Sequence, residues 1–459
     1  MRPPRHAPRW HHLLGLPFGR KERALFALAG AGLALLLATA LLPWGTPQHA
    51  VLAITIGILF LWLSEFLPLH VTALLIPFLL VAFGGFEPAA ALAGFFDPII
   101  ALVLGGFAIA LGMQKHGLDA WLGEKLVHDG STPRHVLLGL MAATALLSMW
   151  MANSAAAAIM LPIGLVILRE NKLLPGSRWG KGVVLGIGFA ATIGGLGTLV
   201  GSTPNILVAK FLNQSGIAFG FLDWLVFGLP LMAALLLGAW AILSFLFRAE
   251  IARVRVEKAD RKLTGKQQQV LGVFLLTVLL WLTADLHGVN IGIVSLVPLF
   301  LLYGLGLLDT KDFHALDWPS LILIGGGISL GFAMHASGLD AVMATALGSS
   351  ILGQPAILIS LLVIGFGVLL TGFASNTAAA AVMIPFMIPV AALTGLDPRT
   401  LAFLAGVGVS MDFVMPAGTP PTTMAYGTGY LKLRELLLAG LLVSAMGILV
   451  GAVFSALIW

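Results

Sequence analysis

The sequence predicts an all-α polytopic membrane protein with about 11 transmembrane helices and two re-entrant helical hairpins in an inverted repeat. Three observations predict this class. Apolar residues make up 59% of the chain and charged residues only 10%, with a mean hydropathy of +1.01, which is more apolar sequence than a soluble core can bury. Apolar stretches of bilayer-spanning length recur from end to end. A polar motif also occurs twice, each time halfway through an apolar stretch.

The apolar stretches mark the expected spans. In chain order these are 24–42, 50–68, 71–84, 98–113, 182–211, 222–247, 267–285, 290–308, 318–334, 400–428 and 432–458. Two further stretches, 135–168 and 354–393, carry the polar motif at an interruption. We interpret them as re-entrant hairpins with tips near the middle of the membrane, because polar groups at that depth are tolerated only inside protein or beside a cavity.

The repeated motif runs from Asn153 to Pro162 in the first half and from Asn376 to Pro385 in the second. Each copy places an amide and a hydroxyl at the start of a helix. Four alanines follow the hydroxyl in both copies. Polar breaks at matching places in two halves are expected to line one cavity in which a polar ligand binds.

The duplication extends beyond the hairpins. Gly105-Gly106 precedes Gly117 by the same spacing with which Gly326-Gly327 precedes Gly338. After each hairpin, a span contains glycine, hydroxyl and proline residues together, at 201–205 and at 418–422. Proline lacks an amide hydrogen, so these helices are expected to unwind and leave carbonyls free. A simple kink is the usual meaning of an isolated proline, but the recurrence favours unwinding.

Basic residues predict the topology. Seven Lys and Arg lie from Arg248 to Lys266, whereas the expected outer loops at 43–49, 84–97 and 285–289 contain none. The positive-inside rule then places the amino terminus in the cytoplasm. The start of the chain also resembles a signal peptide, but this topology argues against cleavage. Basic residues flank the first hairpin and are nearly absent around the second, so the hairpins are expected to enter from opposite sides.

Charge and cysteine content exclude other classes. The positive-inside rule explains the formal charge of +5 without nucleic acid, which we exclude as a partner. The chain contains no cysteine, so disulfides and thiol chemistry are excluded.

The helix ends at each tip predict what binds there. An incoming helix presents its carbonyl end, and the outgoing helix, which begins near Asn153 or Asn376, presents free amides and its positive dipole end. Cations suit the first end and anions the second. Neither tip contains a charged side chain, so cations that bind together with an anion must help to compensate its charge. This pattern favours cation-coupled anion transport, although Ser154 and Thr377 alone are also typical N-caps.

These residues resemble the divalent anion:sodium symporters. The segments 148–154 and 375–377, each followed by a Thr-Pro segment, are similar to the paired Ser-Asn-Thr motifs of that family. The resemblance covers most of the chain from about residue 50, and further matches lie at 65–75, 105–107, 317–319 and 325–327.

The resemblance implies a homodimeric elevator-type transporter in the cell inner membrane. Each protomer would have a scaffold that forms the dimer and a moving domain that carries both hairpins. The implied divisions are a basic cytoplasmic segment 1–23, scaffold helices 24–97, a first repeat core 98–211, scaffold and connecting helices 212–317 with the basic loop 248–266, a second repeat core 318–428 and a C-terminal helix 429–459.

The resemblance also implies the ligand residues. Two Na⁺ ions would be bound, the first by Ser148, Ala152, Asn153 and Gly201 and the second by Thr371, Ala374, Ser375, Asn376 and Gly418. The carboxylates of the substrate would be held by Asn153, Ser154, Asn376 and Thr377, with Ser202, Thr419 and Pro420 lining the same pocket.

Several positions depart from the family pattern. Ala152 stands in place of Ser, which removes a hydroxyl from the first cation site, whereas Ser154 in place of Thr keeps its hydroxyl. Thr422 replaces an Asn after the second proline pair. Asp412 falls within the membrane, where acids are costly and often functional. We expect it either to carry a proton or to be a hydrogen-bonded structural acid.

Substrate and coupling stay open at the level of sequence. Amides and hydroxyls without a fixed cation suit four-carbon dicarboxylates such as succinate, malate or fumarate, and they also suit sulfate or tricarboxylates. Sodium symport, proton symport and exchange of dicarboxylates are all compatible. An intramembrane enzyme is the competing class, but the sequence has no nucleophile with a base and no metal-binding motif. A channel is disfavoured because two opposed hairpins around one site suit occlusion.

Overall fold

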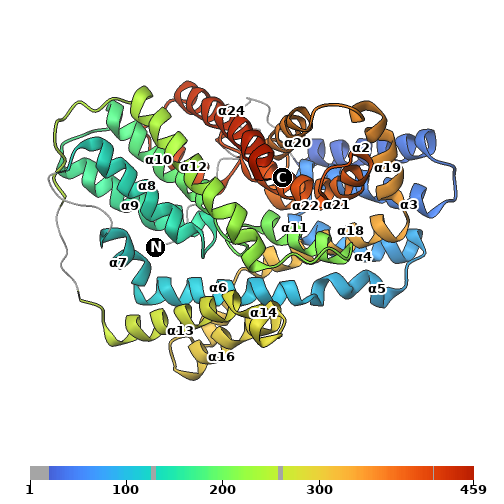
Figure 1. Ribbon diagram of the computed structural model, residues 1–459, viewed down its shortest axis with the longest axis horizontal. Helices are drawn as coiled ribbons and strands as arrows, with labels where there is room; N and C mark the ends of the chain where they lie inside the picture. Colours follow the sequence, from blue (N-terminus) through green and yellow to red (C-terminus); the bar gives the residue numbers. More distant parts are fainter. Residues whose placement is uncertain (1–19, 126–130, 257–261, 417, 459) are drawn as a thin grey trace.

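The computed structural model describes residues 20–125, 131–256, 262–416 and 418–458, and most of them are helical (Figure 1). Residues 1–19 of the expected basic segment lie outside the described residues. The helices of the first half are α2 (Arg20–Leu41), α3 (Pro47–Ser64), α4 (Leu69–Gly84), α5 (Pro88–Leu92), η1 (Ala93–Phe96), α6 (Pro98–His116), α7 (Leu118–Lys125), α8 (Pro133–Ser148), α9 (Asn153–Glu170), α10 (Arg178–Gly194), α11 (Thr203–Gln214) and α12 (Phe221–Leu246).

The second half continues the same alternation of long and short helices. Its elements are α13 (Gly265–Leu282), α14 (Ala284–His287), α15 (Ile291–Val294), α16 (Leu296–Gly304), α17 (Thr310–Ala315), α18 (Trp318–Ala336), α19 (Leu339–Ile351), α20 (Ala356–Thr371), α21 (Asn376–Thr394), α22 (Pro398–Ser410), α23 (Pro420–Gly427) and α24 (Leu433–Ile458).

Long apolar helices confirm the membrane class. Among the described residues, seven helical segments are long and apolar enough to cross a bilayer, if α5 to α6 count as one. Several shorter apolar helices accompany them. Both hairpins form as predicted, because α8 meets α9 and α20 meets α21 at a tight tip. The predicted broken spans are also confirmed, since α10 and α11, and likewise α22 and α23, are separated by a non-helical segment.

The prediction of an outer loop at 84–97 is wrong. Residues 88–96 form α5 and η1, which continue into α6 as one rod that lies above α13 and α16 in the view of Figure 1. This rod packs against α18, where a Cβ atom added to Gly94 would lie 2.6 Å from the Gly325 carbonyl oxygen. Pro88 and Pro98 each stand in the first turn of a helix, a position that proline favours. Both prolines therefore begin helices.

Two short helices that follow matching glycines were not predicted. Gly117 and Gly338 end α6 and α18 in the left-handed conformation, with φ of +67° and +74°, as glycine permits. The chain then turns into α7 and α19. The first turn of each contains a buried acid, Asp119 or Asp340. The repeated Gly-Leu-Asp-Ala sequence thus marks a helix end followed by a new helix.

The two halves exchange their packing partners. From the first half, α4 packs along α18 of the second, and from the second half, α15 and α16 pack along α6 of the first. Added Cβ atoms show how close these contacts are. One on Gly105 would lie 2.1 Å from the Ser295 carbonyl oxygen, and one on Gly326 would lie 2.9 Å from the Ala73 Cα. The matched glycines therefore allow helices of the two halves to pack closely against each other.

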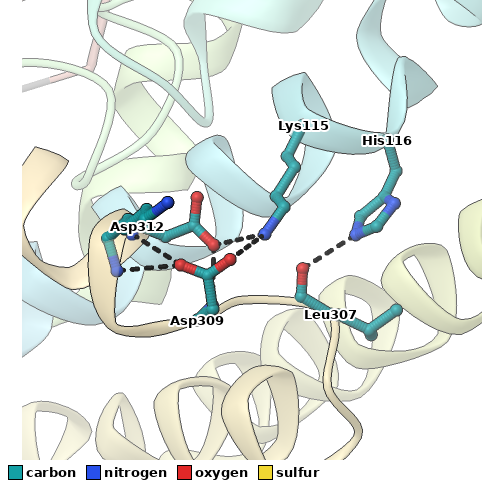
Figure 2. A network of polar contacts seen from close by, with 6 residues as sticks. Lys115, His116, Leu307, Asp309 and Asp312 are labelled. Carbon is teal, nitrogen blue, oxygen red and sulfur yellow. Dashed lines mark hydrogen bonds and ion pairs between the residues drawn. The ribbon is translucent and has the colours of Figure 1, made fainter.

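A polar network ties the end of α6 to the second half (Figure 2). Lys115 Nζ pairs with Asp309 Oδ2 at 3.1 Å and also contacts Asp312, while His116 Nε2 lies 2.9 Å from the Leu307 carbonyl oxygen. The hydrogen bond from the Lys115 ammonium holds the pKa of the Asp309 carboxyl below its ordinary value. These contacts fix α6 against the loop between α16 and α17.

The hairpins and the broken spans form a second interlocked group, which we call the hairpin bundle (α8–α11 and α20–α23). Within it, α23 of the second half packs against α9 and α10, and α11 of the first half packs against α21 and α22. The first hairpin lies toward one end of the long axis of Figure 1 and the second toward the other end. Their entry from opposite sides of the membrane, which the distribution of basic residues favours, stays a prediction.

Candidate functional site

The two hairpin tips are closed by equivalent hydrogen bonds. At the first tip, Ser148 Oγ at the end of α8 lies 2.8 Å from the side-chain amide of Asn153. At the second, Thr371 Oγ1 at the end of α20 lies 2.7 Å from Asn376 Oδ1. A hydroxyl on the incoming helix thus holds the asparagine that begins the outgoing helix. The repeated asparagines have a defined place at both tips.

The Asn153 amide is inserted into the unwound segment that follows α10. Ser148 Oγ donates to the Ala191 carbonyl oxygen, so its single hydrogen is used and it accepts from the Asn153 NH₂ group. In this orientation the amide also donates to the carbonyl oxygens of Ala191 and Gly201, each at 3.3 Å. A Cβ atom on Gly195 would meet this amide at 2.5 Å. Glycine is therefore required where the first tip meets the broken span.

The N-caps of α9 and α21 show whether the hydroxyls of Ser154 and Thr377 cap these helices or are available to a ligand. The cap of α21 is Ser375, whose Oγ accepts from Ala378 N at 3.2 Å. The cap of α9 is Ala152, which has no side chain for this bond. Within the described residues, the hydroxyls of Ser154 and Thr377 form no hydrogen bond. They are therefore not N-caps, and they are free to bind a ligand.

Different braces hold the two unwound segments. After α10, Asn205 Nδ2 donates to the carbonyl oxygens of Gly195 at 2.7 Å and Thr198 at 2.8 Å. After α22, the hydroxyls of Thr419 and Thr422 lie 2.9 Å apart, and Thr423 Oγ1 donates to the Pro416 carbonyl oxygen at 2.7 Å. Thr422 occupies the position that matches Asn205. Its shorter side chain explains why the second segment is held by hydroxyls instead.

A cavity of about 240 Å³ lies where the tips and the broken spans meet. Sites for drug-sized ligands usually occupy about 300–1,000 Å³, so this cavity suits a smaller molecule. Both tips, both unwound segments and one face of α6 line it. The lining residues are Val103, Gly106, Phe107, Trp150, Met151, Ala152, Asn153, Ser154, Val200, Gly201, Ser202, Thr203, Ile206, Asp317, Ser320, Ser375, Asn376, Thr377, Gly418, Thr419, Pro420 and Pro421.

All seven predicted substrate residues therefore line one cavity. They are Asn153, Ser154, Ser202, Asn376, Thr377, Thr419 and Pro420. Of the residues implied for sodium, Ala152, Gly201, Ser375 and Gly418 also line it. Thr371 and Ala374 face a neighbouring cavity of about 260 Å³, which shares Ser375 and Gly418 with the first. Ser148 and Asp412 are buried behind these walls.

Asp317 and Ser320 are lining residues that we did not predict. Asp317 is the N-cap of α18, and its carboxylate accepts from the backbone amide of Ser320 at 3.2 Å and from the Ser320 hydroxyl. Among the described residues that line the cavity, Asp317 is the only one with a charged side chain. The signal was present in the sequence, since Asp317-Trp318-Pro319 matches the family pattern, but nothing local shows which end of α18 faces the cavity.

An aromatic cluster supports the first tip. The Trp150 ring stacks on Phe221 with centroids 6.3 Å apart, and it meets Phe274 edge-on at 5.1 Å and Trp281 at 6.5 Å. Phe274 and Trp281 belong to α13, and Phe221 begins α12. One side of the Trp150 residue therefore lines the cavity, while its ring rests against helices outside the hairpin bundle.

The electrostatics of the cavity come from helix ends rather than basic residues. The described lining residues include no Lys, Arg or His, whereas α9 and α21 begin at the cavity wall with free amides. Such amide ends favour an anion. The oxygen atoms of Ser148, Thr371, Asn376 and the unwound carbonyls suit a hard cation such as Na⁺. Asn153 would add its own oxygen only if its amide, which now donates to these carbonyls, turned over. Among the described residues there is no cluster of three His, Cys, Asp or Glu.

Two opposed hairpin tips that meet two unwound helices at one small polar cavity define a membrane transporter built as an inverted repeat. Comparison with protein families specifies it further. The chain belongs to the citrate transporter family (CitMHS), whose family model matches residues 57–369 and 279–459.

Relatives agree with this family. The chain is 35% identical over 436 residues to an uncharacterized transporter of Haemophilus influenzae, covering 91% of this chain and 93% of that one. It is 31% identical to the sodium-dependent dicarboxylate transporter SdcS of Staphylococcus saprophyticus, covering 87% and 84%. These names confirm the predicted resemblance and identify the chain as a transporter rather than an enzyme.

A solved structure shares the fold. The crystal structure of the Alcanivorax borkumensis YdaH transporter, described as having an unusual topology, matches with a TM-score of 0.56 over 81% of this chain and 87% of that chain. The sequence identity is 14%, so this likeness concerns the arrangement of helices alone.

Proposed function

We propose that the chain is a secondary active transporter that moves a small divalent anion across the cytoplasmic membrane by a cation-coupled elevator mechanism. The proposed substrate is a four-carbon dicarboxylate such as succinate, malate or fumarate. One observation carries the proposal: two hairpin tips with hydroxyls free of protein partners converge on a cavity of about 240 Å³ that has helix amino termini in its wall. Such a cavity offers hydrogen bonds to two carboxylates.

The proposed substrate contacts come in pairs from the two halves. Asn153 and Ser154 would bind one carboxylate, and Asn376 and Thr377 the other, with Ser202, Thr419 and Pro420 completing the wall. The side chains of Asn153 and Asn376 already form the hydrogen bonds that close the tips. The remaining donors for a substrate are the hydroxyls of Ser154 and Thr377 and the free backbone amides of α9 and α21. Because the repeat provides one pair from each half, a dicarboxylate would lie with one carboxylate at each tip.

The proposed cation sites lie beside each tip. Ser148, Ala152, Asn153 and Gly201 would form the first, and Thr371, Ala374, Ser375, Asn376 and Gly418 the second. The dianion would be compensated there, because no basic side chain among the described residues lines the cavity. The name of the staphylococcal relative, a sodium-dependent dicarboxylate transporter, supports Na⁺ as the coupling ion.

In the proposed elevator movement the hairpin bundle would move, while α3–α6 and α13–α18 would form the static scaffold. Within this scaffold α4 packs against α18, and α16 packs against α6. The proposal thus assigns α6 and α18 to the scaffold, although the sequence-based division places them in the two repeat cores and α18 packs against α21 of the bundle. The proposal places the protein as a homodimer in the cell inner membrane with its amino terminus in the cytoplasm. The lack of Lys and Arg in the expected outer loops at 43–49 and 285–289 supports this orientation.

Three alternatives of the same fold make different predictions. A dicarboxylate exchanger would need substrate on both sides, a sulfate transporter would not accept succinate, and a citrate transporter, as the family is named, would prefer three carboxylates. Proton coupling through Asp412 is a further alternative to sodium. An intramembrane enzyme is no longer an alternative, because the family and the names of the relatives identify a transporter.

The deciding experiment is uptake into proteoliposomes. Labelled succinate, sulfate and citrate are offered under separately imposed gradients of sodium, protons and internal substrate. We expect saturable succinate uptake that requires an inward sodium gradient and shows counterflow. Uptake that depends only on internal substrate would make the protein an exchanger, and sulfate uptake without succinate uptake would overturn the substrate.

The variant Asn376→Ala connects this activity to the cavity. It removes the amide that closes the second tip and should abolish uptake. Gln268→Ala, on the exposed first turn of α13, is the control and should transport normally. Full activity of a folded Asn376→Ala protein would contradict the placement of the site.

A further inference from the structure

Asp412 is a buried carboxylate in the unwound segment between α22 and α23. Its side chain is 2% exposed. Among the described residues, the backbone amides of Val414 and Met415 hydrogen-bond to the carboxyl group, but its Oδ2 atom has no hydrogen-bond partner and no basic side chain pairs with it. A buried charge in this situation is expensive, and native structures rarely retain one without a compensating group. Two backbone amides do not neutralise a full charge, so a carboxylate that stays ionised here would need a cation from outside the chain.

The carboxylate lies directly behind Gly418. A Cβ atom added to Gly418 would lie 1.8 Å from Asp412 Oδ2 and 2.4 Å from its Cγ. Gly418 is one of the residues shared by the central cavity and the cavity beside the second tip. The negative charge is thus separated from both cavities by the width of a single backbone. Only glycine at position 418 allows this approach.

The first repeat fills the equivalent space with a neutral group. Gly195 precedes Gly201 by the same number of residues as Asp412 precedes Gly418. A Cβ atom on Gly195 would meet the Asn153 amide at 2.5 Å. An amide therefore lies in the first unwound segment where a carboxylate lies in the second. The repeat is symmetric in its backbone and asymmetric in its charge.

The two tips also differ in a hydroxyl, and this difference again favours a cation at the second tip. Ala152 provides no hydroxyl at the first tip, whereas its counterpart Ser375 does at the second. The candidate cation site at the first tip is thus poorer in oxygen and has no carboxylate behind it. The site at the second tip has both.

We infer that Asp412 is the charge-compensating carboxylate of the second cation site, so that the second site binds its cation more tightly than the first. The inference rests on the proposed function as a cation-coupled transporter and adds to it a ranking of the two sites. Asp412 acts on the cation through the field of its charge and by supporting the Gly418 backbone. It is a positioning residue rather than a member of the cavity wall.

The test measures binding without transport. Purified wild-type protein and variants are heated in increasing NaCl, with choline chloride keeping the ionic strength constant and no substrate present. We expect Na⁺ to raise the unfolding temperature of the wild type with a saturable dependence. In Asp412→Asn the half-saturating Na⁺ concentration should rise at least tenfold.

Two further variants sharpen the test. Asp340→Asn removes a buried acid in α19 that pairs with His335, so it controls for loss of a buried carboxylate elsewhere and should leave the half-saturating concentration unchanged. Asp412→Ser removes the charge with a smaller polar side chain, and should weaken Na⁺ stabilisation even if Asp412→Asn fails to fold.

The outcomes separate this inference from the proposed function. An unchanged half-saturating Na⁺ concentration in Asp412→Asn, or in Asp412→Ser where the first variant does not fold, would overturn the role of Asp412 while leaving sodium coupling intact. A wild-type protein that Na⁺ does not stabilise at all would overturn sodium coupling itself, and with it the ranking of the sites.

Discussion

Lys210 on α11 forms an ion pair with Asp97 at the start of α6. The two side chains are 17% and 15% exposed, so the pair is largely shielded from solvent. It joins the hairpin bundle to the scaffold helix that packs against α13, α15 and α16. A relative movement of these two groups must break it, so the pair stabilises the arrangement seen in this structure.

The two halves of the repeat do not occupy equivalent positions. Gly327 of α18 touches the second hairpin, since a Cβ atom on Gly327 would lie 2.8 Å from Ala381 Cβ. Their counterparts in the first half are Gly106 and Ala158. A Cβ atom on Gly106 would meet only Val200 within 4 Å, and Ala158 is exposed whereas Ala381 is buried. Matched residues of the two halves therefore have different surroundings, as expected for one end state of the proposed elevator movement.

A movement that exchanges these environments predicts a contact absent here. In the opposite state, Gly106 and Ala158 should meet as Gly327 and Ala381 do now. Cysteines at 106 and 158 can be introduced without interference, because the chain has none. We expect oxidation to form the 106–158 disulfide during turnover, and Lys210→Met to accelerate it by weakening the ion pair.

The control for this crosslink is each single-cysteine variant, which should give no intramolecular product. Lys210→Met should also lower the free energy of unfolding, by about 1–3 kcal/mol for a shielded pair. Absence of the 106–158 disulfide in a protein that transports would argue against an elevator movement related by the repeat.

The free hydroxyls at the tips predict an effect on affinity without an effect on stability. Thr377→Val keeps the shape of the side chain and removes a donor that has no partner among the described residues. A hydrogen bond to a charged group contributes about 1.5–3 kcal/mol, so the substrate KM should rise roughly 10- to 100-fold. The unfolding temperature should stay within the range of a surface substitution.

Ser154→Ala provides the matched measurement in the other half. If both hydroxyls bind carboxylates, each variant should weaken uptake. A large drop in the unfolding temperature for either one would mean that the hydroxyl supports the fold, which the structure does not predict.

The sequence is sufficient to predict the hairpins and the residues at their tips, because the physical signal is local. A polar pair such as Asn153-Ser154 inside apolar sequence must be buried against a partner, and its second copy indicates which partner. The broken spans are predicted for the same reason, since Pro204 and Pro420 cannot continue a helical ladder. These are consequences of unsatisfied backbone groups in hydrocarbon.

The scaffold side of the cavity could not be predicted in this way. Val103 and Phe107 are ordinary apolar residues of a long span, and either face of α6 could meet the cavity. Asp317 and Ser320 belong to the first turn of α18 and line the cavity only because the halves exchange packing partners. The helical segment at 88–96 was not predicted because the absence of Lys and Arg, on which the loop was based, carries no information on helix formation.

Removal of the Asp317 charge should improve substrate binding. It is a carboxylate in the wall of a cavity proposed to bind a dianion, so Asp317→Asn should lower the substrate KM, roughly two- to fivefold at low ionic strength, by removing like-charge repulsion. Asn is also a good N-cap, so the start of α18 should remain intact.

Added salt supplies the control for Asp317→Asn. The difference between variant and wild type should shrink as ionic strength rises. A higher KM in the variant would mean that the acid instead contributes to binding, for example by holding a cation near the substrate.

Because helices of the two halves pack closely at the matched glycines, a methyl group added there should destabilise the protein. Gly105→Ala places a methyl group 2.1 Å from the Ser295 carbonyl oxygen, and overpacking of this kind costs about 1–3 kcal/mol. Gly272→Ala in α13 has nothing within 4 Å of its new methyl group and should be neutral or stabilising by up to about 1 kcal/mol. Thermal unfolding of the two variants in one detergent compares them directly, and equal effects would contradict the close contact.

Ala152 predicts what a restored hydroxyl would do. Its counterpart Ser375 caps α21 through a hydrogen bond from Ala378 N, so Ala152→Ser should cap α9 in the same way and stabilise the protein by about 0.5–2 kcal/mol. Ser375→Ala should lose a similar amount. Thermal unfolding without sodium measures this capping effect on its own.

Sodium titration of uptake then separates capping from cation binding. If position 152 contributes a ligand oxygen, Ala152→Ser should lower the half-activating Na⁺ concentration in addition to its effect on stability. The cap uses the hydroxyl as an acceptor and leaves a second lone pair free, so the two roles are compatible. A stabilised protein with an unchanged sodium titration would show that the backbone carbonyl alone suffices at the first site, because the added hydroxyl would then be bound only to its own helix.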